Sequence, residues 1–226
     1  ECFKKPQNIN KIILTASGGP FRNWSNEQMK NASVESALKH PNWKMGKKIS
    51  VDSATMMNKG LEILEAHWLF KLKNKEIDVI VHPESIVHSM VEFEDNSTLA
   101  QLSNPDMSVP IAFGLSWPGR KSNQIETINW KKIKHLSFCS VDTKKFPAID
   151  IARNVLAEGP TAGMILNTAN EIAVEAFLSR KIHFLEITDT VEKILEKMEK
   201  SFSFEIKSLA ELHELHKDIH RQFSHL

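Results

Sequence analysis

The chain has 226 residues, of which 41% are hydrophobic and 25% are charged, and its formal net charge is +1. These values are ordinary for a globular protein of one large domain or two modest ones. The small net charge argues against a broad nucleic-acid-binding surface, which needs a clear basic excess, and no apolar run approaches the roughly 18 residues of a membrane span.

The first predicted elements are a strand and a long loop. The apolar, β-branched run Ile12-Ile13-Leu14-Thr15 predicts a buried strand, and Ser17-Gly18-Gly19-Pro20 ends it sharply. Residues 22–48 are mostly polar and predict a long loop that contains one short helix.

A helix and three strands come next. Residues 56–71 carry apolar side chains at helical spacing, and Asp52 or Ser53 is a plausible N-cap for this helix. Three strands are predicted after it, the second and third forming a hairpin: 77–81, 88–93 and 98–102. A short helix at 109–117 follows the hairpin.

The second half of the chain has a helical pattern. Residues 118–145 are polar and irregular and predict a linker. Four helices are predicted beyond it: 147–158, 161–179, 187–200 and 205–223. Gly159-Pro160 predicts a break between the first two. Because strands come first and helices second, the sequence predicts an α+β domain followed by a small all-α helical domain.

The glycine turn after the first strand has two interpretations. A serine and two glycines, Ser17-Gly18-Gly19, can turn successive backbone N–H groups into a concavity that suits an anion such as phosphate. An ordinary glycine turn accounts for the same residues, so this motif predicts little by itself.

A second polar cluster lies in the stretch SVDSATMMNKGLE at 50–62. On a helix, Asn58, Lys59 and Glu62 lie near one face, and Ser53 is expected near the helix N-terminus, which favours a negative group. Such a set suits a phosphate or sugar hydroxyls, and Glu62 suits a hard divalent metal. The alternative is a capping serine beside a surface Lys59–Glu62 pair worth about 0.3 kcal/mol.

The loop HPNWKMG at 40–46 is the third feature. Its Trp43 and Met45 fit either a lid that closes over a ligand or a loop anchored to the core. His40 could contact a substrate or simply be solvated.

The other histidines give weaker signals. His82 and His88 lack the further ligands of a zinc site. His213, His216 and His220 lie three and four residues apart on the last predicted helix and could bind a metal, although a charged surface face is the favoured interpretation. The chain contains no P-loop and no G-x-G-x-x-G motif.

Taken together, these segments resemble the 1-deoxy-D-xylulose 5-phosphate reductoisomerase family of the non-mevalonate isoprenoid pathway. The resemblance rests on these motifs: TASGGPFR at 15–22, HPNWKMGKKISVDSATMMNKGLE at 40–62, EAHWLF at 65–70, VIVHPESIVHSMVEFEDNS at 79–97, LAQLSNPDM at 99–107 and LNTANEIAVEAFL at 166–178. They cover most of the chain, and the 40–62 block is long enough to be highly specific.

The resemblance implies a central catalytic domain at 1–117 with a mixed sheet and a flexible lid loop at 22–48, a linker at 118–145 and a C-terminal helical domain at 146–226. It also implies an upstream NADPH-binding part and two upstream metal-binding carboxylates. Neither lies in this chain, which we therefore expect to be inactive alone.

Residue roles also follow from the resemblance. The substrate-binding residues would be Ser17, His40, Ser53, Asn58, Lys59 and Glu62, of which Glu62, His40 and Lys59 would be catalytic. Glu62 would bind Mg²⁺ or Mn²⁺, Gly46 and Met107 would contact NADPH, and Trp43 and Met45 would form the apolar side of the lid. The implied reaction is a metal-assisted rearrangement of 1-deoxy-D-xylulose 5-phosphate and its reduction by NADPH to 2-C-methyl-D-erythritol 4-phosphate.

Partners and location complete the expectations. The family implies a phosphorylated sugar substrate and a homodimer. Two cysteines, Cys2 and Cys139, are too few for a disulfide framework, which favours a reducing compartment. The Lys- and Asn-rich chain without Tyr fits an AT-rich genome and favours a plastid-like organelle of the apicoplast type over a bacterial cytoplasm. Two alternatives stay open: a metal-dependent phosphosugar isomerase or lyase without NADPH, and a non-catalytic phosphate-binding module.

Overall fold

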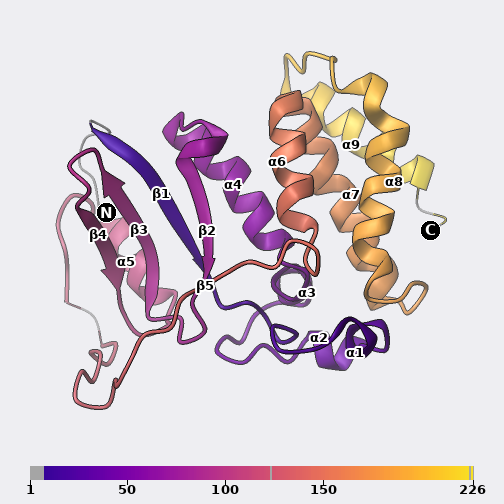
Figure 1. Ribbon diagram of the computed structural model, residues 1–226. Coiled ribbons are helices and arrows are strands. Elements are labelled where there is room, and N and C mark those ends of the chain that lie inside the picture. Colours follow the sequence, from indigo (N-terminus) through magenta and orange to yellow (C-terminus); the bar gives the residue numbers. More distant parts are fainter. Residues whose placement is uncertain (1–7, 123, 224, 226) are drawn as a thin grey trace. The chain divides into compact units, whose positions relative to one another are not determined.

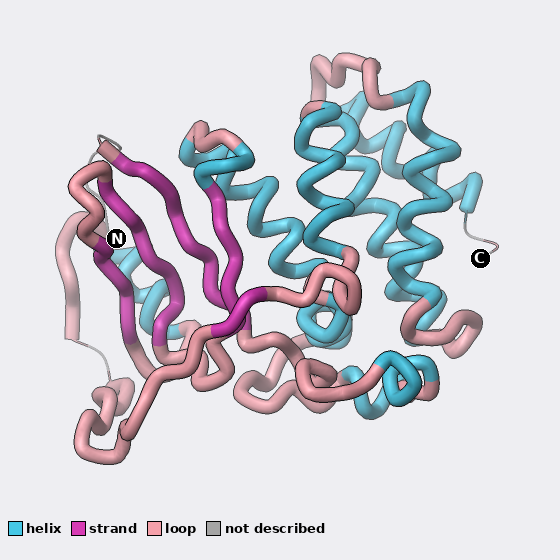
Figure 2. Tube along the Cα trace, in the orientation of Figure 1, coloured by secondary structure: helices cyan, strands magenta, loops and turns pink. Residues whose placement is uncertain are grey.

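The computed structural model describes residues 8–122, 124–223 and 225, and the chain divides into two compact units. The first contains residues up to Ser17 and Lys75–Ser140, and the second contains Gly18–Asn74 and Val141–Leu226. The strands lie in the first unit (Figure 1), and most of the helical residues lie in the second (Figure 2). The predicted mixed sheet and C-terminal helices are present, but residues 18–74, which lie between the first two strands in sequence, group with the helices rather than with the strands.

The first unit is built on a five-stranded mixed sheet in the order β4-β3-β1-β2-β5. Its strands are β1 (Ile9–Ala16), β2 (Ile77–Val81), β3 (Val87–Phe93), β4 (Thr98–Leu102) and β5 (Cys139–Ser140). The β1–β2 pair is parallel and the other pairs are antiparallel. The predicted strands and the hairpin are confirmed. Strand β5 is new, because it lies inside the segment predicted as an irregular linker.

Two short helical segments accompany the sheet, one at the boundary of the first unit and one inside it. The 3₁₀-helix η1 (Asn74–Glu76) leads into β2, and α5 (Ser108–Ser116) follows β4 as predicted. No residue of α5 is buried, although its sequence is strongly apolar. Ile111 and Leu115 are 55% and 86% exposed, so much of the apolar surface of this helix is accessible in the part of the chain that the structure describes.

The second unit is helical. Its elements are α1 (Asn26–Lys30), α2 (Val34–Ala37), α3 (Lys47–Thr55), α4 (Met57–Phe70), α6 (Ala148–Glu158), α7 (Pro160–Leu178), α8 (Glu186–Met198), the 3₁₀-helix η2 (Glu199–Ser201) and α9 (Leu209–Phe223). The four predicted C-terminal helices correspond to α6–α9. Gly159 has a φ of +102° and Pro160 is the first residue of α7, which accounts for the predicted break.

The segment before α4 differs from the prediction. Residues 22–48 contain two short helices and the start of a third, where one was expected. Residues 47–55 form the helix α3, so Asp52 and Ser53 lie inside a helix and neither caps α4. The expected N-cap was wrong because α3 runs almost directly into α4.

Helix α7 is the centre of the second unit. It packs against α6, α8, α9 and α3, while α4 packs against α6. A methyl group on Gly60 of α4 would lie 3.0 Å from both the Ala148 carbonyl oxygen and the Ala152 Cβ, so the helices cross at close range. This packing ties residues 57–70 to the C-terminal helices. The domain boundaries at 117 and 146 stay a prediction.

One further negative observation concerns membranes. Across residues 8–122, 124–223 and 225, no helix combines the length and the apolar character that a membrane crossing requires.

Candidate active site

The candidate site is built around the corner where α3 meets α4. A single residue, Met56, caps both helices, with φ +66° and ψ +7°. This left-handed conformation costs a residue with a side chain about 1–2 kcal/mol, but Met56 is buried and its packing offsets part of that cost. The last turn of α3 and the first turn of α4 are therefore fixed beside each other.

The first turns of α4 carry the polar set that the sequence singled out. Asn58 Nδ2 donates to Glu62 Oε1 at 2.7 Å, and Lys59 Nζ donates to Glu62 Oε2 at 2.6 Å. The side chains of Lys59 and Glu62 are 13% and 33% exposed, so this is a partly desolvated cluster rather than a surface ion pair. Partial burial and the Glu62 charge also raise the pKa of Glu65, one turn further on, although Lys59 opposes this.

The glycine turn lies against the same corner. Gly18 and Gly19 have φ values of +81° and +66°, and a Cβ on Gly19 would lie 2.5 Å from the Ser53 carbonyl oxygen. Only glycine permits both the backbone angle and the close approach. The turn Gly18-Gly19 therefore lies against Ser53. An anion-binding concavity at the α3–α4 corner requires this proximity.

Ser53 does not lie near a helix N-terminus, where it was expected. Ser53 lies in the last turn of α3, where the helix dipole is negative. The helix N-terminus at this corner belongs instead to α4, which begins at Met57 without a side-chain cap and has Asn58 and Lys59 in its first turn. An anion is favoured there.

A buried carboxylate that sequence reasoning missed supports the corner from α3. The side chain of Asp52 is 3% exposed. It accepts hydrogen bonds from Lys48 Nζ at 2.7 Å and from Asn170 Nδ2 at 2.8 Å. The Lys48–Asp52 spacing of four was visible in the sequence, but the Asn170 partner on α7 was not. Asn170 Oδ1 is buried without a hydrogen-bond partner in the described chain.

His40 organises the predicted lid loop. Its Nδ1 accepts hydrogen bonds from the backbone N–H groups of Asn42 and Trp43, at 3.1 and 3.0 Å. Burial, assisted by the Arg22 charge, lowers the pKa of His40. The ring is therefore neutral near pH 7, with its proton on Nε2. His40 is thus a structured part of the loop as well as a possible substrate contact.

The remaining predicted residues occupy separate positions. Trp43 and Met45 are half-buried, and Gly46 is exposed as the N-terminal cap of α3. Ser17 and Met107 belong to the first unit. Met107 is exposed and is the N-cap of α5. The corner therefore joins Ser53, Asn58, Lys59 and Glu62 within one unit.

The histidine at the end of β2 has a structural role. His82 Nδ1 bonds to the Ser137 carbonyl oxygen at 2.8 Å, and Nε2 accepts from the Ile86 N–H at 3.1 Å. The ring also stacks on Phe138. Both ring nitrogens therefore bind backbone groups.

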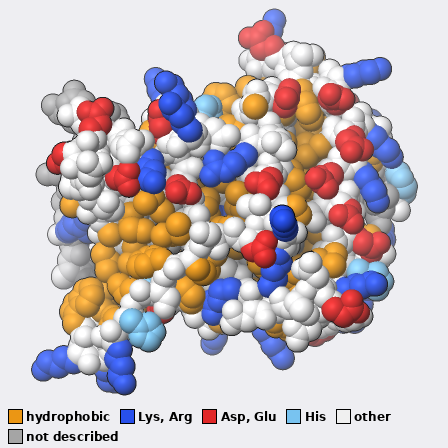
Figure 3. All heavy atoms as spheres, viewed as in Figure 1, with side chains coloured by type: hydrophobic (Ala, Val, Ile, Leu, Met, Phe, Trp, Pro, Cys, Tyr) orange, Lys and Arg blue, Asp and Glu red, His pale blue; other side chains and the backbone are white. Residues whose placement is uncertain are grey.

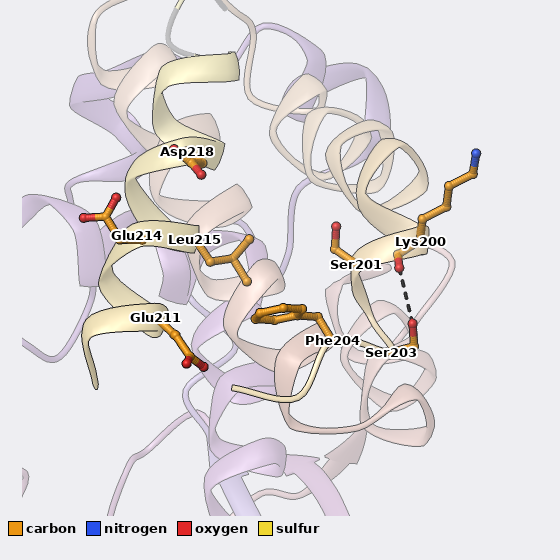
Figure 4. A pocket seen from close by; sticks show the side chains of 8 residues that line it. All are labelled: Lys200, Ser201, Ser203, Phe204, Glu211, Glu214, Leu215 and Asp218. Carbon is orange, nitrogen blue, oxygen red and sulfur yellow. Dashed lines mark hydrogen bonds between the residues drawn. The ribbon is translucent and has the colours of Figure 1, made fainter. Parts of the chain in front are cut away.

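A surface pocket of about 510 Å³ lies elsewhere in the second unit. In Figure 4, Phe204 and Leu215 point into it, and Glu211, Glu214 and Asp218 line it from α9. Three carboxylates against one lysine, Lys200, disfavour a phosphorylated ligand. The pocket is therefore not the candidate active site.

The ligands for a divalent ion at the corner are incomplete within the described residues. The group of three potential metal ligands found among the described residues lies on α7 and α9 and consists of Glu171, His216 and His220, without Glu62. A hard ion takes six or more oxygen ligands. The Glu62 carboxylate has the right chemistry for one of them.

Known proteins match this chain in sequence. Residues 102–222 match a family model described as the DXP reductoisomerase C-terminal domain, and residues 1–70 match one described as the 1-deoxy-D-xylulose 5-phosphate reductoisomerase C-terminal domain. The 1-deoxy-D-xylulose 5-phosphate reductoisomerase of Pelodictyon phaeoclathratiforme is 54% identical over 192 residues, which are 85% of this chain and 50% of that protein. The same enzyme of Chlorobium chlorochromatii is 48% identical over 219 residues, or 97% and 57%.

Solved structures match as well. A DOX-P reductoisomerase in complex with NADPH, fosmidomycin and magnesium has a TM-score of 0.93 and 44% identity, and the match covers 96% of this chain and 55% of that one. The enzyme from Zymomonas mobilis in complex with NADPH has a TM-score of 0.89 and 39% identity, covering 99% and 57%. The chain spans about half the length of the curated relatives it matches.

The organisms of the relatives bear on location. They are bacteria, so the expected plastid-like organelle is not supported and the bacterial alternative is favoured.

Proposed function

Since the chain belongs to the 1-deoxy-D-xylulose 5-phosphate reductoisomerase family, we propose that it contributes the substrate-binding part of an enzyme that rearranges and reduces 1-deoxy-D-xylulose 5-phosphate. The observation that carries the proposal is the Glu62 carboxylate, held by Asn58 and Lys59 in the first turns of α4, whose N-cap Met56 makes no side-chain capping hydrogen bond. The product would be 2-C-methyl-D-erythritol 4-phosphate.

The substrate phosphate would be held at the corner. Lys59 supplies a positive charge there, Asn58 supplies an amide donor, and the glycine turn lies against Ser53. Binding energy from a phosphate group remote from the reacting atoms would hold the other end of the substrate in place. Ser17 and His40 are proposed as further contacts.

A divalent ion, Mg²⁺ or Mn²⁺, would supply Lewis-acid polarisation of the substrate oxygens when bound. Glu62 would provide one of its ligands. Lys59 Nζ donates to Glu62 Oε2 at 2.6 Å. On binding, the lysine would exchange the carboxylate for the substrate phosphate.

The cofactor would meet the chain at two exposed positions. Gly46 is the N-cap of α3, and a Cβ added to it would meet no atom within 4 Å, so this side of its backbone is accessible to NADPH. Lys47, also exposed, follows it in the positive first turn of α3, where a cofactor phosphate is favoured. Met107 is the second proposed contact, and Trp43 and Met45 would form the apolar side of the closing lid.

A second copy of the chain is the proposed partner. Hydrophobic side chains gather over the strands of the first unit (Figure 3). Large exposed hydrophobic residues of this unit are Leu99, Met107, Ile111, Leu115, Trp117, Trp130 and Phe138. A surface of this kind marks an interface, and among the described residues β4 is an edge strand of the sheet, which could pair with another chain. Analytical ultracentrifugation tests the dimer, and a monomer at all concentrations would contradict it.

The reaction is tested with the protein in its full encoded length. NADPH oxidation is followed by absorbance with 1-deoxy-D-xylulose 5-phosphate and Mn²⁺. We expect turnover that fosmidomycin inhibits, and a loss of about 100-fold or more in Glu62→Gln because a ligand charge is removed at nearly constant volume. Glu175→Gln on the exposed side of α7 is the matched control and should keep normal turnover.

Two results would contradict the proposal. The first is normal metal-dependent turnover in Glu62→Gln. The second is a folded protein that binds the phosphorylated sugar without oxidising NADPH, which would favour the isomerase, lyase or binding-module alternatives.

A further inference from the structure

Three potential metal ligands meet between α7 and α9, away from the α3–α4 corner in sequence. Glu171 Oε2 lies 3.9 Å from His216 Nε2 and 3.7 Å from His220 Nε2. One ligand atom from each residue lies within 4.8 Å of the other two. These separations exceed a hydrogen bond but are close to the roughly 3.4 Å between ligand atoms around a tetrahedral zinc ion.

The histidines come from one helix and the carboxylate from another. His216 and His220 are four residues apart on α9, so both rings face the same side. Their centroids are 4.5 Å apart. All three side chains are half-buried, between 33% and 37% exposed. An ion could therefore reach them from solvent and bind both helices at once.

The buried Thr168 contacts the His216 ring. Thr168 Oγ1 donates to the Met164 carbonyl oxygen at 3.1 Å and lies 3.0 Å from His216 Nδ1. With the hydroxyl proton assigned to Met164, the hydroxyl oxygen accepts from a protonated Nδ1, and this is the tautomer that we assign to His216. The Nε2 lone pair of neutral His216 is then directed to the Glu171 side, as in protein metal sites whose histidines are oriented by their other nitrogen.

The carboxylate is oriented in a comparable way. Asn167 Nδ2 donates to Glu171 Oε1 at 3.1 Å. This contact leaves Glu171 Oε2 toward the two imidazoles. His216 and Glu171 thus each have a neighbouring side chain, Thr168 and Asn167, that orients them toward the centre of the cluster. A chance cluster of surface charges would not require such orienting contacts.

We propose that Glu171, His216 and His220 form a zinc-binding site that fastens α9 to α7. Two imidazole nitrogens and one carboxylate are a ligand set for Zn²⁺, and a water molecule would complete the tetrahedron. The set is too poor in oxygen for Mg²⁺. The site is distinct from the proposed catalytic ion at Glu62.

The site is tested by titrating the untagged full-length protein, stripped with a chelator, with zinc chloride in a calorimeter. We expect about one tight equivalent per chain and a rise in the melting temperature. Both should be lost in His216→Gln, His220→Gln and Glu171→Gln, while circular dichroism shows unchanged helix content. Co²⁺ bound in place of Zn²⁺ should give the visible absorption bands of tetrahedral coordination.

Two further variants test which side chains on α7 and α9 the zinc ion depends on. His213→Gln removes an exposed histidine of the same helix and should leave zinc affinity unchanged. Thr168→Val keeps the side-chain volume but removes the hydroxyl, and should weaken zinc binding by about 10–100-fold.

Glu62→Gln separates the two metal sites. It should retain the zinc equivalent while losing Mn²⁺-dependent NADPH oxidation, so the two proposals fail independently. No tight equivalent in the wild type, or equal zinc affinity in His220→Gln, would overturn the zinc site.

Discussion

Glu62 on α4 and Glu171 on α7 are held in the same way but face different groups. Each accepts, through Oε1, a hydrogen bond from an asparagine four residues earlier: Asn58 at 2.7 Å and Asn167 at 3.1 Å. Each presents Oε2 to positively charged or ionisable neighbours. At Glu62 the neighbour is Lys59, and at Glu171 the neighbours are two histidines.

The difference decides what each carboxylate can bind. A lysine has a fixed charge and no lone pair, so it can hold a phosphate but cannot ligate a metal. An imidazole can give its lone pair to a borderline metal such as zinc. The same Asn-x-x-x-Glu spacing would therefore serve the proposed substrate site in one helix and the proposed zinc site in another.

The variant with the largest expected effect removes Asp52, which supports the α3–α4 corner near Glu62. Asp52→Ala should lower the free energy of unfolding by roughly 3 kcal/mol. The variant removes the carboxylate that pairs with Lys48 and leaves the buried Asn170 amide without its hydrogen bond to residue 52. Urea unfolding measures the change. Glu171→Ala, whose neighbours reach solvent, should cost much less. Equal losses in the two variants would contradict this contrast.

The second prediction concerns how closely α4 is packed. Gly60→Ala should destabilise the protein by about 1–2 kcal/mol, because the new methyl group lies 3.0 Å from atoms of α6. Gly163→Ala on α7 is the control. Its methyl group would meet Leu64 at 3.6 Å, an ordinary contact, so helix propensity should make this variant neutral or stabilising by up to about 1 kcal/mol. Thermal unfolding distinguishes the two, and equal shifts would refute the close crossing.

The third prediction compares the two asparagines. Asn58→Ala and Asn167→Ala should each cost only about 0.5 kcal/mol of stability. Their binding effects should separate: Asn58→Ala weakens binding of the phosphorylated sugar and Asn167→Ala weakens binding of zinc. If either variant impaired both ligands, the two sites would not be independent.

The smallest expected effect is a pH dependence at His40. Its pKa is lowered in the folded state, so the unfolded chain binds the proton more tightly and stability falls as pH drops below about 6.5. His40→Asn should reduce this acid sensitivity between about pH 7 and about pH 5. Urea unfolding at several pH values gives the slope, and an unchanged slope in the variant would exclude His40 as its source.

Much of the fold follows from local patterns. The strands 77–81 and 98–102, and the helices of the C-terminal half, are found where apolar periodicity predicts them. Long periodic segments bounded by Gly159-Pro160 leave little choice of element type. The short β5 was missed because two residues carry no period, and it exists only through pairing with β2.

The site was predictable in composition but only partly in geometry. Asn58, Lys59 and Glu62 share a face because α4 is a regular helix, which spacing alone predicts. The helix α3 was missed because its mixture of serine, valine and threonine has weak helix propensity. The Asn170–Asp52 contact spans 118 residues, and no local pattern encodes a contact of that separation.

The single residue between α3 and α4, Met56, limits which insertions and deletions this part of the chain can accept. One residue separates α3 from α4, so no slack exists between Ser53 and Glu62. An α-helix turns about 100° per residue, and a one-residue insertion continuing α4 would rotate Glu62 away from its present direction. The corner therefore tolerates replacement of side chains, but the number of codons between Ser53 and Glu62 is fixed.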